Sequence, residues 1–224
     1  MGAALLLRSQ GLPVVVLESR GADQLAAQAH ELVAAGISVR LNTPLTSEAF
    51  QAELRSPAAV VVSPGIPWDH PVLSELRGRG IPVQGELVPA WRSLAAVPWI
   101  GITGTNGKTT VTHLVHHLLS HAGLDAPLCG NVGNSAAELA LRRRQSGGPL
   151  PDWLVAEISS YQIEAAAEIA PRIGVWTTLT PDHLERHGTL EAYRAIKRSL
   201  LERSELRSEE HTSELQSRQY LVCR

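Results

Sequence analysis

Gly101-Ile-Thr-Gly-Thr-Asn-Gly-Lys-Thr-Thr110 is the stretch that decides the fold of this chain. An apolar run ending in Trp99 and Ile100 precedes it, and apolar residues at helical spacing follow it. This is the pattern of a strand, a glycine loop and a helix N-terminus, where backbone N–H groups, the helix dipole and a lysine favour phosphate. The strict P-loop spacing needs glycine at position 102, which is Ile102 here. We predict a variant P-loop for a nucleoside triphosphate, with these candidate nucleotide-binding residues: Gly104, Thr105, Asn106, Gly107, Lys108, Thr109 and Thr110.

Strand-like and helix-like segments alternate on both sides of this loop. The predicted strands before the loop cover 12–17, 37–41, 58–62 and 81–84, and the helices cover 22–35, 47–55 (with Ser47 as its cap) and 71–79. After position 97, strands are predicted at 98–102, near Leu128, at 153–158 and at 172–179, with helices at 108–121, 135–144, near Gln162 and at 190–203. Such alternation predicts an α/β fold with parallel sheets. We place a Rossmann-like domain at 1–92 and an incomplete P-loop ATPase-type domain with a parallel sheet at 93–206.

Both ends of the sequence are unusual. Residues 2–10 predict a helix that packs against a sheet, with no strand before it, although a nucleotide-binding α/β domain normally opens with a strand and a glycine turn. We therefore expect that the first strand is missing and that Met1 is an internal start within a longer natural sequence. Residues 207–217 resemble one reading frame of a common sequencing-library adapter, and 221–224 continue it. We expect 207–224 to be a foreign tail rather than a natural polar helix.

Composition excludes several classes of protein. The net charge of −2 offers nothing for nucleic acid, and no apolar run approaches the ~18 residues of a membrane span. Two cysteines provide no disulfide framework, which favours a reduced cytoplasmic setting. We expect a cytoplasmic monomer with no nucleic-acid or membrane partner.

Three polar clusters follow predicted strands downstream of the glycine loop. They are Gly130-Asn131-Val132-Gly133, Ala156-Glu157-Ile-Ser-Ser-Tyr-Gln-Ile-Glu164 and Thr178-Leu-Thr-Pro-Asp-His-Leu-Glu-Arg-His-Gly188, the last followed by Tyr193 and Lys197. The carboxyl ends of parallel strands face the ligand crevice. The residues alone also allow roles without any ligand: Glu157 could be a surface carboxylate, His183 could be capped locally by Asp182, and Lys197 could be solvated.

Together with the glycine loop, these clusters resemble the Mur ligases, the ATP-dependent amide-forming enzymes of peptidoglycan assembly. Thr103-Gly-Thr-Asn-Gly-Lys-Thr-Thr110 is similar to the P-loop of that family. Three further motifs resemble the branch that adds D-glutamate to UDP-N-acetylmuramoyl-L-alanine: Ser63-Pro-Gly-Ile-Pro67, Glu157-Ile-Ser-Ser-Tyr-Gln162 and Leu179-Thr-Pro-Asp-His-Leu-Glu-Arg-His-Gly188. The resemblance covers nearly all of 1–206.

The resemblance implies that the ATP γ-phosphoryl group moves to the substrate carboxylate and that the amine of D-glutamate attacks the acyl phosphate. Because two anions must approach, cations must neutralise the developing charge. The implied catalytic residues are Lys108 on the β- and γ-phosphates, Glu157, His183 and Lys197. The implied ligands of one Mg²⁺ are the oxygen groups of Thr109 and Glu157. His183 would bind a second Mg²⁺ or the substrate. Lys197 matches a lysine that becomes carbamylated and could then ligate the metal.

The resemblance also implies where the UDP-sugar binds. Glu18, Ser19 and Arg20 would grip the uracil, although the family commonly has aspartate at the first position and Glu18 lengthens that arm. Ser63, Pro64 and Gly65 would take the diphosphate, because glycine lets the backbone approach closely. Asn131, Ser159, Gln162 and His183 would contact the muramoyl-alanine or phosphate end.

Three rival functions remain at this point. The Mur ligase that adds the third stem-peptide residue shares the P-loop and the Asp182-His183-Leu184 cluster, but not the Ser63–Pro67 and Ser160–Gln162 motifs. A small-molecule P-loop kinase lacks the usual loop spacing. A non-catalytic module that binds nucleotide or UDP-sugar is the third, because we expect this chain as written to lack ligase activity.

Overall fold

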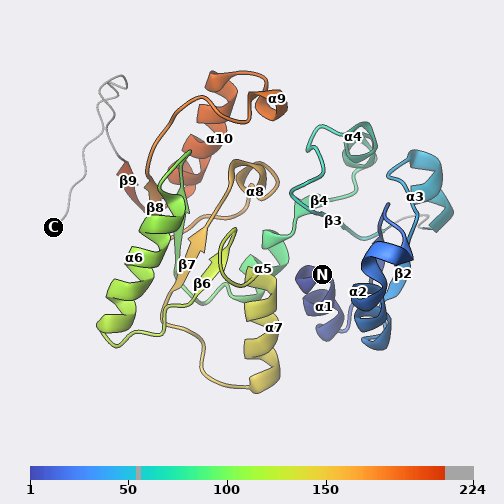
Figure 1. Cartoon of the computed structure of the whole chain (residues 1–224), viewed down its shortest axis with the longest axis horizontal. Helices are drawn as coiled ribbons and strands as arrows, with labels where there is room; N and C mark the ends of the chain where they lie inside the picture. The colour runs from blue at the N-terminus through green and yellow to red at the C-terminus, as the bar shows by residue number, and fades with distance from the viewer. Residues whose placement is uncertain (54–56, 210–224) are drawn as a thin grey trace.

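The computed structural model describes residues 1–53 and 57–209 as an α/β protein with exclusively parallel strand pairing among those residues (Figure 1). The N-terminal half contains α1 (Gly2–Ser9), β1 (Val15–Leu17), α2 (Ala22–Ala34), β2 (Ser38–Arg40), α3 (Ser47–Glu53), β3 (Val60–Val62), α4 (Pro71–Gly78) and β4 (Val83–Gly85). The second half contains α5 (Leu87–Ser93), β5 (Trp99–Thr103), α6 (Lys108–His121), β6 (Leu128–Gly130), α7 (Ala136–Ser146), β7 (Leu154–Glu157), α8 (Ser160–Glu164), β8 (Ile173–Trp176), α9 (Leu184–His187), α10 (Leu190–Arg203) and β9 (Leu206–Glu209). The predicted α/β class is confirmed.

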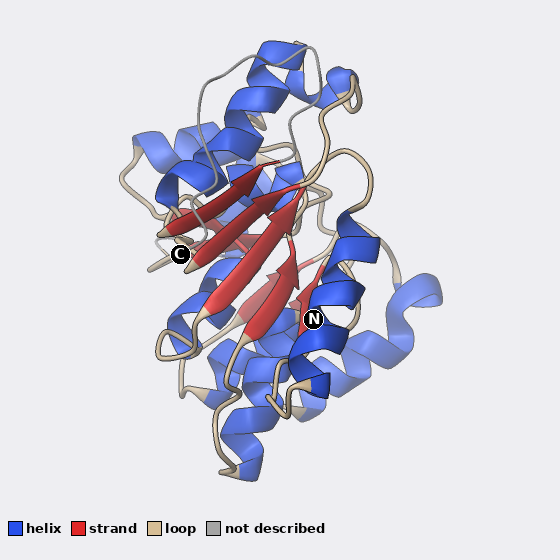
Figure 2. Ribbon diagram, turned by 90° about the vertical axis from the view of Figure 1, so that its left-hand side faces the viewer, coloured by secondary structure: helices blue, strands red, loops and turns tan. Residues whose placement is uncertain are grey.

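A five-stranded parallel sheet forms the centre of the second half, in the order β6-β7-β5-β8-β9 (Figure 2). β5 lies in the middle, and its residues are all buried, as expected for a parallel strand covered on both faces. The chain moves to one side of β5 for β6 and β7 and then crosses to the other side for β8. The glycine loop therefore leaves the carboxyl end of the central strand, where strand order reverses and ligands bind in open α/β sheets.

Helices cover both faces of this sheet (Figure 1). On one face, Val111, Val115 and Leu119 of α6 pack against a cluster that includes Ile102 and Val155. On the other face, α5 and α7 enclose a larger cluster that includes Trp99 and Leu154. β5 and β7, the strands that lead to the glycine loop and to Glu157, are thus packed against apolar side chains on both faces of the sheet.

α1 packs against helices α7 and α5, and Leu6 is fully buried in the cluster of the central sheet. The predicted helix is confirmed, and its main partners are the helices α7 and α5 that cover the central sheet. Its leucine face finds an apolar partner in the helical layer of the second half, a contact between residues more than 100 positions apart that local periodicity cannot specify.

The N-terminal strands form two separate parallel pairs, β1-β2 and β3-β4. Leu17 of β1 nevertheless packs against the same hydrophobic cluster as Val62 of β3. A Rossmann-like domain would join these strands in one sheet, whereas the structure has no ladder between β1 and β3 within the described residues. The alternating sequence pattern predicts the strands but not which of them pair.

Several local expectations are also corrected. The cap of α3 is Thr46, whose hydroxyl accepts a hydrogen bond from the Ala49 N–H, whereas the Ser47 hydroxyl donates to Glu75. The short helices α5 and α9 were not predicted. β9 extends beyond position 206 into the segment interpreted as foreign, and its residues 206–209 pair with β8. Backbone pairing at a sheet edge accepts most side chains, so the origin of 207–224 stays a prediction, and 210–224 lies outside the described residues.

Candidate nucleotide and metal site

Two glycines shape the loop between β5 and α6. Gly107 has φ 77° at the residue before α6, and Gly104 has φ 152°, both in the region that favours glycine. A Cβ on Gly104 would overlap the Thr177 hydroxyl, so no larger residue fits this turn. The loop delivers Lys108 and Thr109 to the first turn of α6, where N–H groups lack intrahelical partners. The structure therefore supplies the anion-binding geometry that the glycine spacing predicts.

The segment after β8 fixes this loop from outside. The Asn106 N–H donates to the Thr178 hydroxyl at 2.9 Å, and the Thr105 N–H donates to the Thr178 carbonyl at 2.8 Å. The Thr177 hydroxyl donates to the Asn106 carbonyl. Sequence reasoning missed these threonines as loop partners, although the polar run after a buried strand was a usable signal. They tie the P-loop to the segment that leads to Asp182 and His183.

Glu157, at the end of β7, is the acid of the site and is only 2% exposed. The Thr109 hydroxyl donates to its Oε2 at 2.7 Å, and Asn131 Nδ2 donates to its Oε1 at 2.8 Å. The surface interpretation of Glu157 is thus wrong. The ends of β6 and β7 and the first turn of α6 bring together Asn131, Glu157 and Thr109. The carboxylate and the hydroxyl offer the oxygen atoms that a hard divalent cation prefers.

Two lysines converge on the same carbonyl of the loop. Lys108 Nζ donates to the Gly104 and Thr105 carbonyls at 3.0 and 2.8 Å, and Lys197 Nζ donates to the Gly104 carbonyl at 2.9 Å. Lys197 is 1% exposed, so the solvated interpretation is wrong. Burial and, secondarily, the charge of Lys108 lower the pKa of Lys197 to about 7. Lys108 therefore supplies positive charge beside the loop, and the low pKa of Lys197 allows its amine to be neutral near pH 7.

His183 and Lys197 both lie near the Tyr193 ring. The Tyr193 ring is 4.5 Å from Lys197 Nζ and its centroid is 6.4 Å from that of His183. His183 has φ 51°, an uncommon conformation for a residue other than glycine, and Asp182 Oδ1 accepts its N–H at 2.9 Å. This contact agrees with the alternative in which Asp182 holds His183 locally, although α9 has no side-chain cap. Neither Glu157 nor Thr109 is a hydrogen-bond partner of His183 within the described structure, so its role at a metal stays a prediction.

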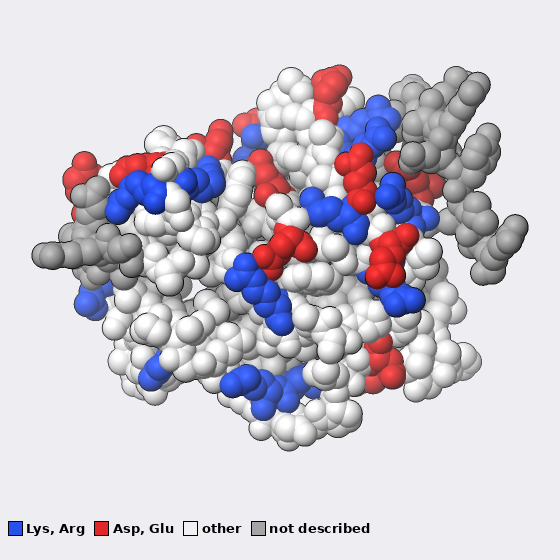
Figure 3. Space-filling view, turned by 180° about the vertical axis from the view of Figure 1, so that it is seen from behind, with Lys and Arg blue, Asp and Glu red and all other residues white. Residues whose placement is uncertain are grey.

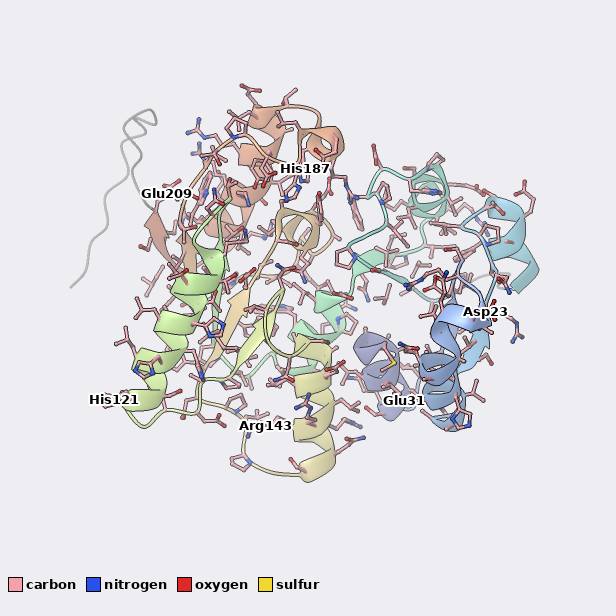
Figure 4. The ribbon with its side chains drawn as sticks, in the orientation of Figure 1. Asp23, Glu31, His121, Arg143, His187 and Glu209 are labelled. Atoms are coloured by element: carbon pink, nitrogen blue, oxygen red, sulfur yellow. The ribbon has the colours of Figure 1, made fainter. Side chains whose placement is uncertain are left out.

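An aromatic cluster surrounds His187, which the sequence did not single out. Its ring stacks on Tyr193 with centroids 5.4 Å apart, and its Nε2 lies 3.0 Å from the Ser160 hydroxyl. Figure 4 labels His187 at the end of α9, on the side of α8. Burial and the charge of Arg186 lower its pKa. The neutral His187 ring therefore joins α8, α9 and α10. It lies at the end of the helix that follows the His183 loop, which we define as residues 177–183 between β8 and α9.

Comparison with known proteins accounts for this arrangement. The Mur ligase middle domain matches residues 102–210, which include the glycine loop, Glu157, His183 and Lys197. This chain belongs to the Mur ligase family.

Named relatives agree with the Mur ligase assignment. The UDP-N-acetylmuramoylalanine--D-glutamate ligase of Parasynechococcus marenigrum (strain WH8102) is 59% identical over 204 residues, which are 91% of this chain and 44% of that protein. The ligase of the same name from Prochlorococcus marinus (strain MIT 9313) is 60% identical over 207 residues, 92% of this chain and 45% of that protein. The chain thus spans less than half the length of these relatives.

A solved Mur ligase structure supports the fold. The UDP-N-acetylmuramate:L-alanyl-gamma-D-glutamyl-meso-diaminopimelate ligase from Neisseria meningitides aligns with 91% of this chain and 64% of its own, with a TM-score of 0.53 and 20% identity. At that identity the likeness concerns the fold alone.

Ser159 and Gln162, two of the predicted substrate contacts of this Mur ligase chain, form a capping box on α8. The Ser159 hydroxyl accepts the Gln162 N–H, and Gln162 Oε1 accepts the Ser159 N–H at 3.0 Å. Gln162 is 5% exposed. Their side chains therefore shape α8 locally, and a substrate contact by either one stays a prediction.

The N-terminal residues predicted to bind UDP lie in two separate turns. Arg20 forms two hydrogen bonds to the Glu18 carboxylate, with Nε–Oε1 and Nη2–Oε2 distances of 3.1 and 3.0 Å. This hydrogen bonding lowers the Glu18 pKa to about 2. At the end of β3, the Ile66 N–H donates to the Ser63 carbonyl at 3.0 Å and closes the turn through Pro64 and Gly65.

The distribution of charged side chains on the face in Figure 3 gives no continuous basic surface for an extended polyanion. Lys, Arg, Asp and Glu are interspersed on the face in Figure 3. In the described part of the chain, no helix has the length and apolarity needed to cross a membrane.

Proposed function

We propose that this chain supplies the UDP-sugar and nucleotide sites of an ATP-dependent ligase that joins D-glutamate to UDP-N-acetylmuramoyl-L-alanine. The observation that carries the proposal is the cluster of Lys108, Thr109, Asn131 and Glu157 at the carboxyl ends of three parallel strands. The relatives at 59–60% identity bear the name of that ligase. Their names favour this substrate over that of the ligase for the third stem-peptide residue.

The chemistry requires several negative charges in one place. The substrate carboxylate attacks the γ-phosphorus of ATP and ADP leaves; the amine of D-glutamate then attacks the acyl carbon and phosphate leaves. Lys108, once released from the loop carbonyls, neutralises the β- and γ-phosphates, and the N-terminus of α6 adds its partial positive charge.

The donor set fits Mg²⁺. Thr109 and Glu157 would hold the ion, since a hydroxyl and a buried carboxylate already face each other at 2.7 Å. When bound, the ion supplies positive charge between the phosphates. Among the described residues no cluster of three or more His, Cys, Asp or Glu stands ready as a separate metal centre. A second ion at His183, and a carbamate on Lys197, remain parts of the proposal; a pKa of about 7 provides the neutral amine that attack on CO₂ requires.

The UDP-sugar spans the two halves in this proposal. The ionised Glu18 accepts the uracil imide N–H, while Arg20 keeps that carboxylate fixed. The N–H groups of the Ser63–Gly65 turn receive the diphosphate. Asn131, Ser159, Gln162 and His183 lie towards the end that carries the reacting carboxylate.

Binding measurements test the proposal on this chain. Calorimetric titration with UDP-N-acetylmuramoyl-L-alanine and with Mg-ATP should show both ligands binding. A kinase-like protein would bind ATP without the UDP-sugar, and the ligase for the third residue would prefer the substrate that already carries D-glutamate. D-Glutamate-dependent phosphate release, assayed in parallel, would contradict our expectation that the chain as written lacks ligation.

A further inference from the structure

Arg186 joins segments 120 residues apart in the sequence. Its Nη2 donates to the Ile66 carbonyl at 3.1 Å and lies 3.4 Å from Glu164 Oε2. Its guanidinium carbon is 4.8 Å from the centre of the Tyr161 ring. One side chain of α9 thus contacts α8 and the turn after β3.

These contacts connect the two proposed substrate sites. Ile66 closes the Ser63–Gly65 turn, the proposed diphosphate site, through its N–H. Arg186 belongs to the helix that begins after His183, and its own N–H donates to the His183 carbonyl at 3.0 Å. A shift of the β3 turn therefore acts on the His183 loop through a single guanidinium.

The surroundings of Arg186 favour a firm connection. The side chains of Arg186 and Glu164 are 14% and 23% exposed, which limits screening by solvent. Burial raises the pKa of Glu164 and Arg186 opposes that rise, as expected for a partly desolvated pair. Beside it, the Gly85 N–H donates to the Ala165 carbonyl at 2.6 Å, so two links between the halves lie next to each other. The planar guanidinium can stack on Tyr161 while it donates to a carbonyl, which an ammonium cannot do.

We propose that Arg186 is a positioning residue that couples the UDP-sugar site to the nucleotide site by holding the Ser63–Ile66 turn against the His183 loop. The inference rests on the proposed function for the identity of the two ligands. Occupancy of the turn by diphosphate then stabilises the arrangement of the His183 loop that nucleotide binding also favours, which is positive coupling between sites.

The test is a thermodynamic cycle on the full 224-residue chain. The affinity for Mg-AMP-PNP is measured with and without saturating UDP-N-acetylmuramoyl-L-alanine in wild type, R186Q and R186K. Arg92 provides a matched control, because it forms two hydrogen bonds to Glu168, at 2.9 and 2.7 Å, on an exposed surface, and neither residue is one of the proposed site residues.

We expect the UDP-sugar to raise nucleotide affinity about fivefold or more in wild type and in R92Q, and less than about twofold in R186Q. R186K should be intermediate, and it carries the test if R186Q fails to fold. A ligand-free readout accompanies the cycle: hydrogen exchange of the Ile66 amide should accelerate about tenfold in R186Q but not in R92Q.

The outcomes separate the two claims. A wild-type chain that binds nucleotide but not the UDP-sugar would overturn the proposed function. A chain that binds both, with the same coupling factor in R186Q as in wild type, would overturn the role of Arg186 alone. An equal loss of coupling in R92Q would also overturn it, because the effect would then not be specific to the contacts of Arg186.

Discussion

Lys197→Met replaces a buried ammonium by an apolar side chain of similar length. In the folded chain the Lys197 pKa falls from 10.5 to about 7, and desolvation is the leading cause. That difference corresponds to a cost of about 5 kcal/mol for folding with the amine protonated. The unfolded chain therefore binds more protons than the folded chain between these two pH values, and the stability of the wild type must rise with pH across this window.

The rise is large enough to measure. Between pH 7 and pH 9 the contribution of Lys197 to the free energy of unfolding increases by about 2 kcal/mol. Lys197→Met lacks this contribution, so its stability relative to the wild type should be greatest at or below pH 7 and decline by about 2 kcal/mol by pH 9. Other titrating groups affect both proteins alike and cancel in the difference.

Urea unfolding followed by tryptophan fluorescence, in CO₂-free buffers at several pH values, measures this difference. Lys108→Met is the matched control: it removes the neighbouring lysine but keeps Lys197, so the rise should persist with its onset at higher pH, because Lys108 lowers the Lys197 pKa. Parallel stability profiles for wild type and Lys197→Met would refute the reasoning, since the ammonium would then have to be hydrated in the folded chain.

Three further predictions concern the proposed ligand sites. Glu157→Gln should weaken Mg²⁺-dependent nucleotide binding at least about tenfold and leave binding in EDTA within about twofold; equal losses in both conditions would argue against a metal role. Gly104→Ala should cost about 2 kcal/mol or more in urea unfolding, because Cβ meets Thr177 at φ 152°, whereas Gly148→Ala, whose nearest neighbour is Ser146 Oγ at 3.5 Å, should change stability by under about 0.5 kcal/mol. Because Arg20 holds the Glu18 pKa at about 2, uridine affinity should stay flat from about pH 4 to pH 8, and a transition near 4.5 would count against this pairing.

Local signals predicted the helices around the site closely. α6 begins at Lys108 and α10 begins at Leu190, as expected from the sequence. A positive-φ glycine precedes α6, and the Thr189 hydroxyl accepts the Ala192 N–H at the start of α10. Such boundaries depend on a few adjacent residues. α5, by contrast, contains Pro89 and forms where burial of Leu87 and Val88 compensates for weak propensity.

The candidate site likewise has parts that adjacent residues predict and parts that only the tertiary structure shows. The glycine loop could be predicted because its φ angles and spacing are properties of consecutive residues. The contact of Glu157 with Thr109 and Asn131 could only be expected from the rule that parallel strands end at one edge, and the hydrogen bonds themselves required the structure. Thr177 and Thr178 were missed as partners of the loop because the polar run after a buried strand marks a candidate cluster but not the distant backbone groups that it binds.

The sequence by itself determined the α/β class, the phosphate loop and the set of polar strand ends, since periodicity and glycine spacing act over a few residues. Only the tertiary structure decided that Lys197 is buried, that α1 packs on α7 and that Arg186 reaches Ile66. The physical reason is that desolvation and long-range contacts depend on which surfaces pack together when the layers assemble. The residues adjacent in the chain do not determine which surfaces those are.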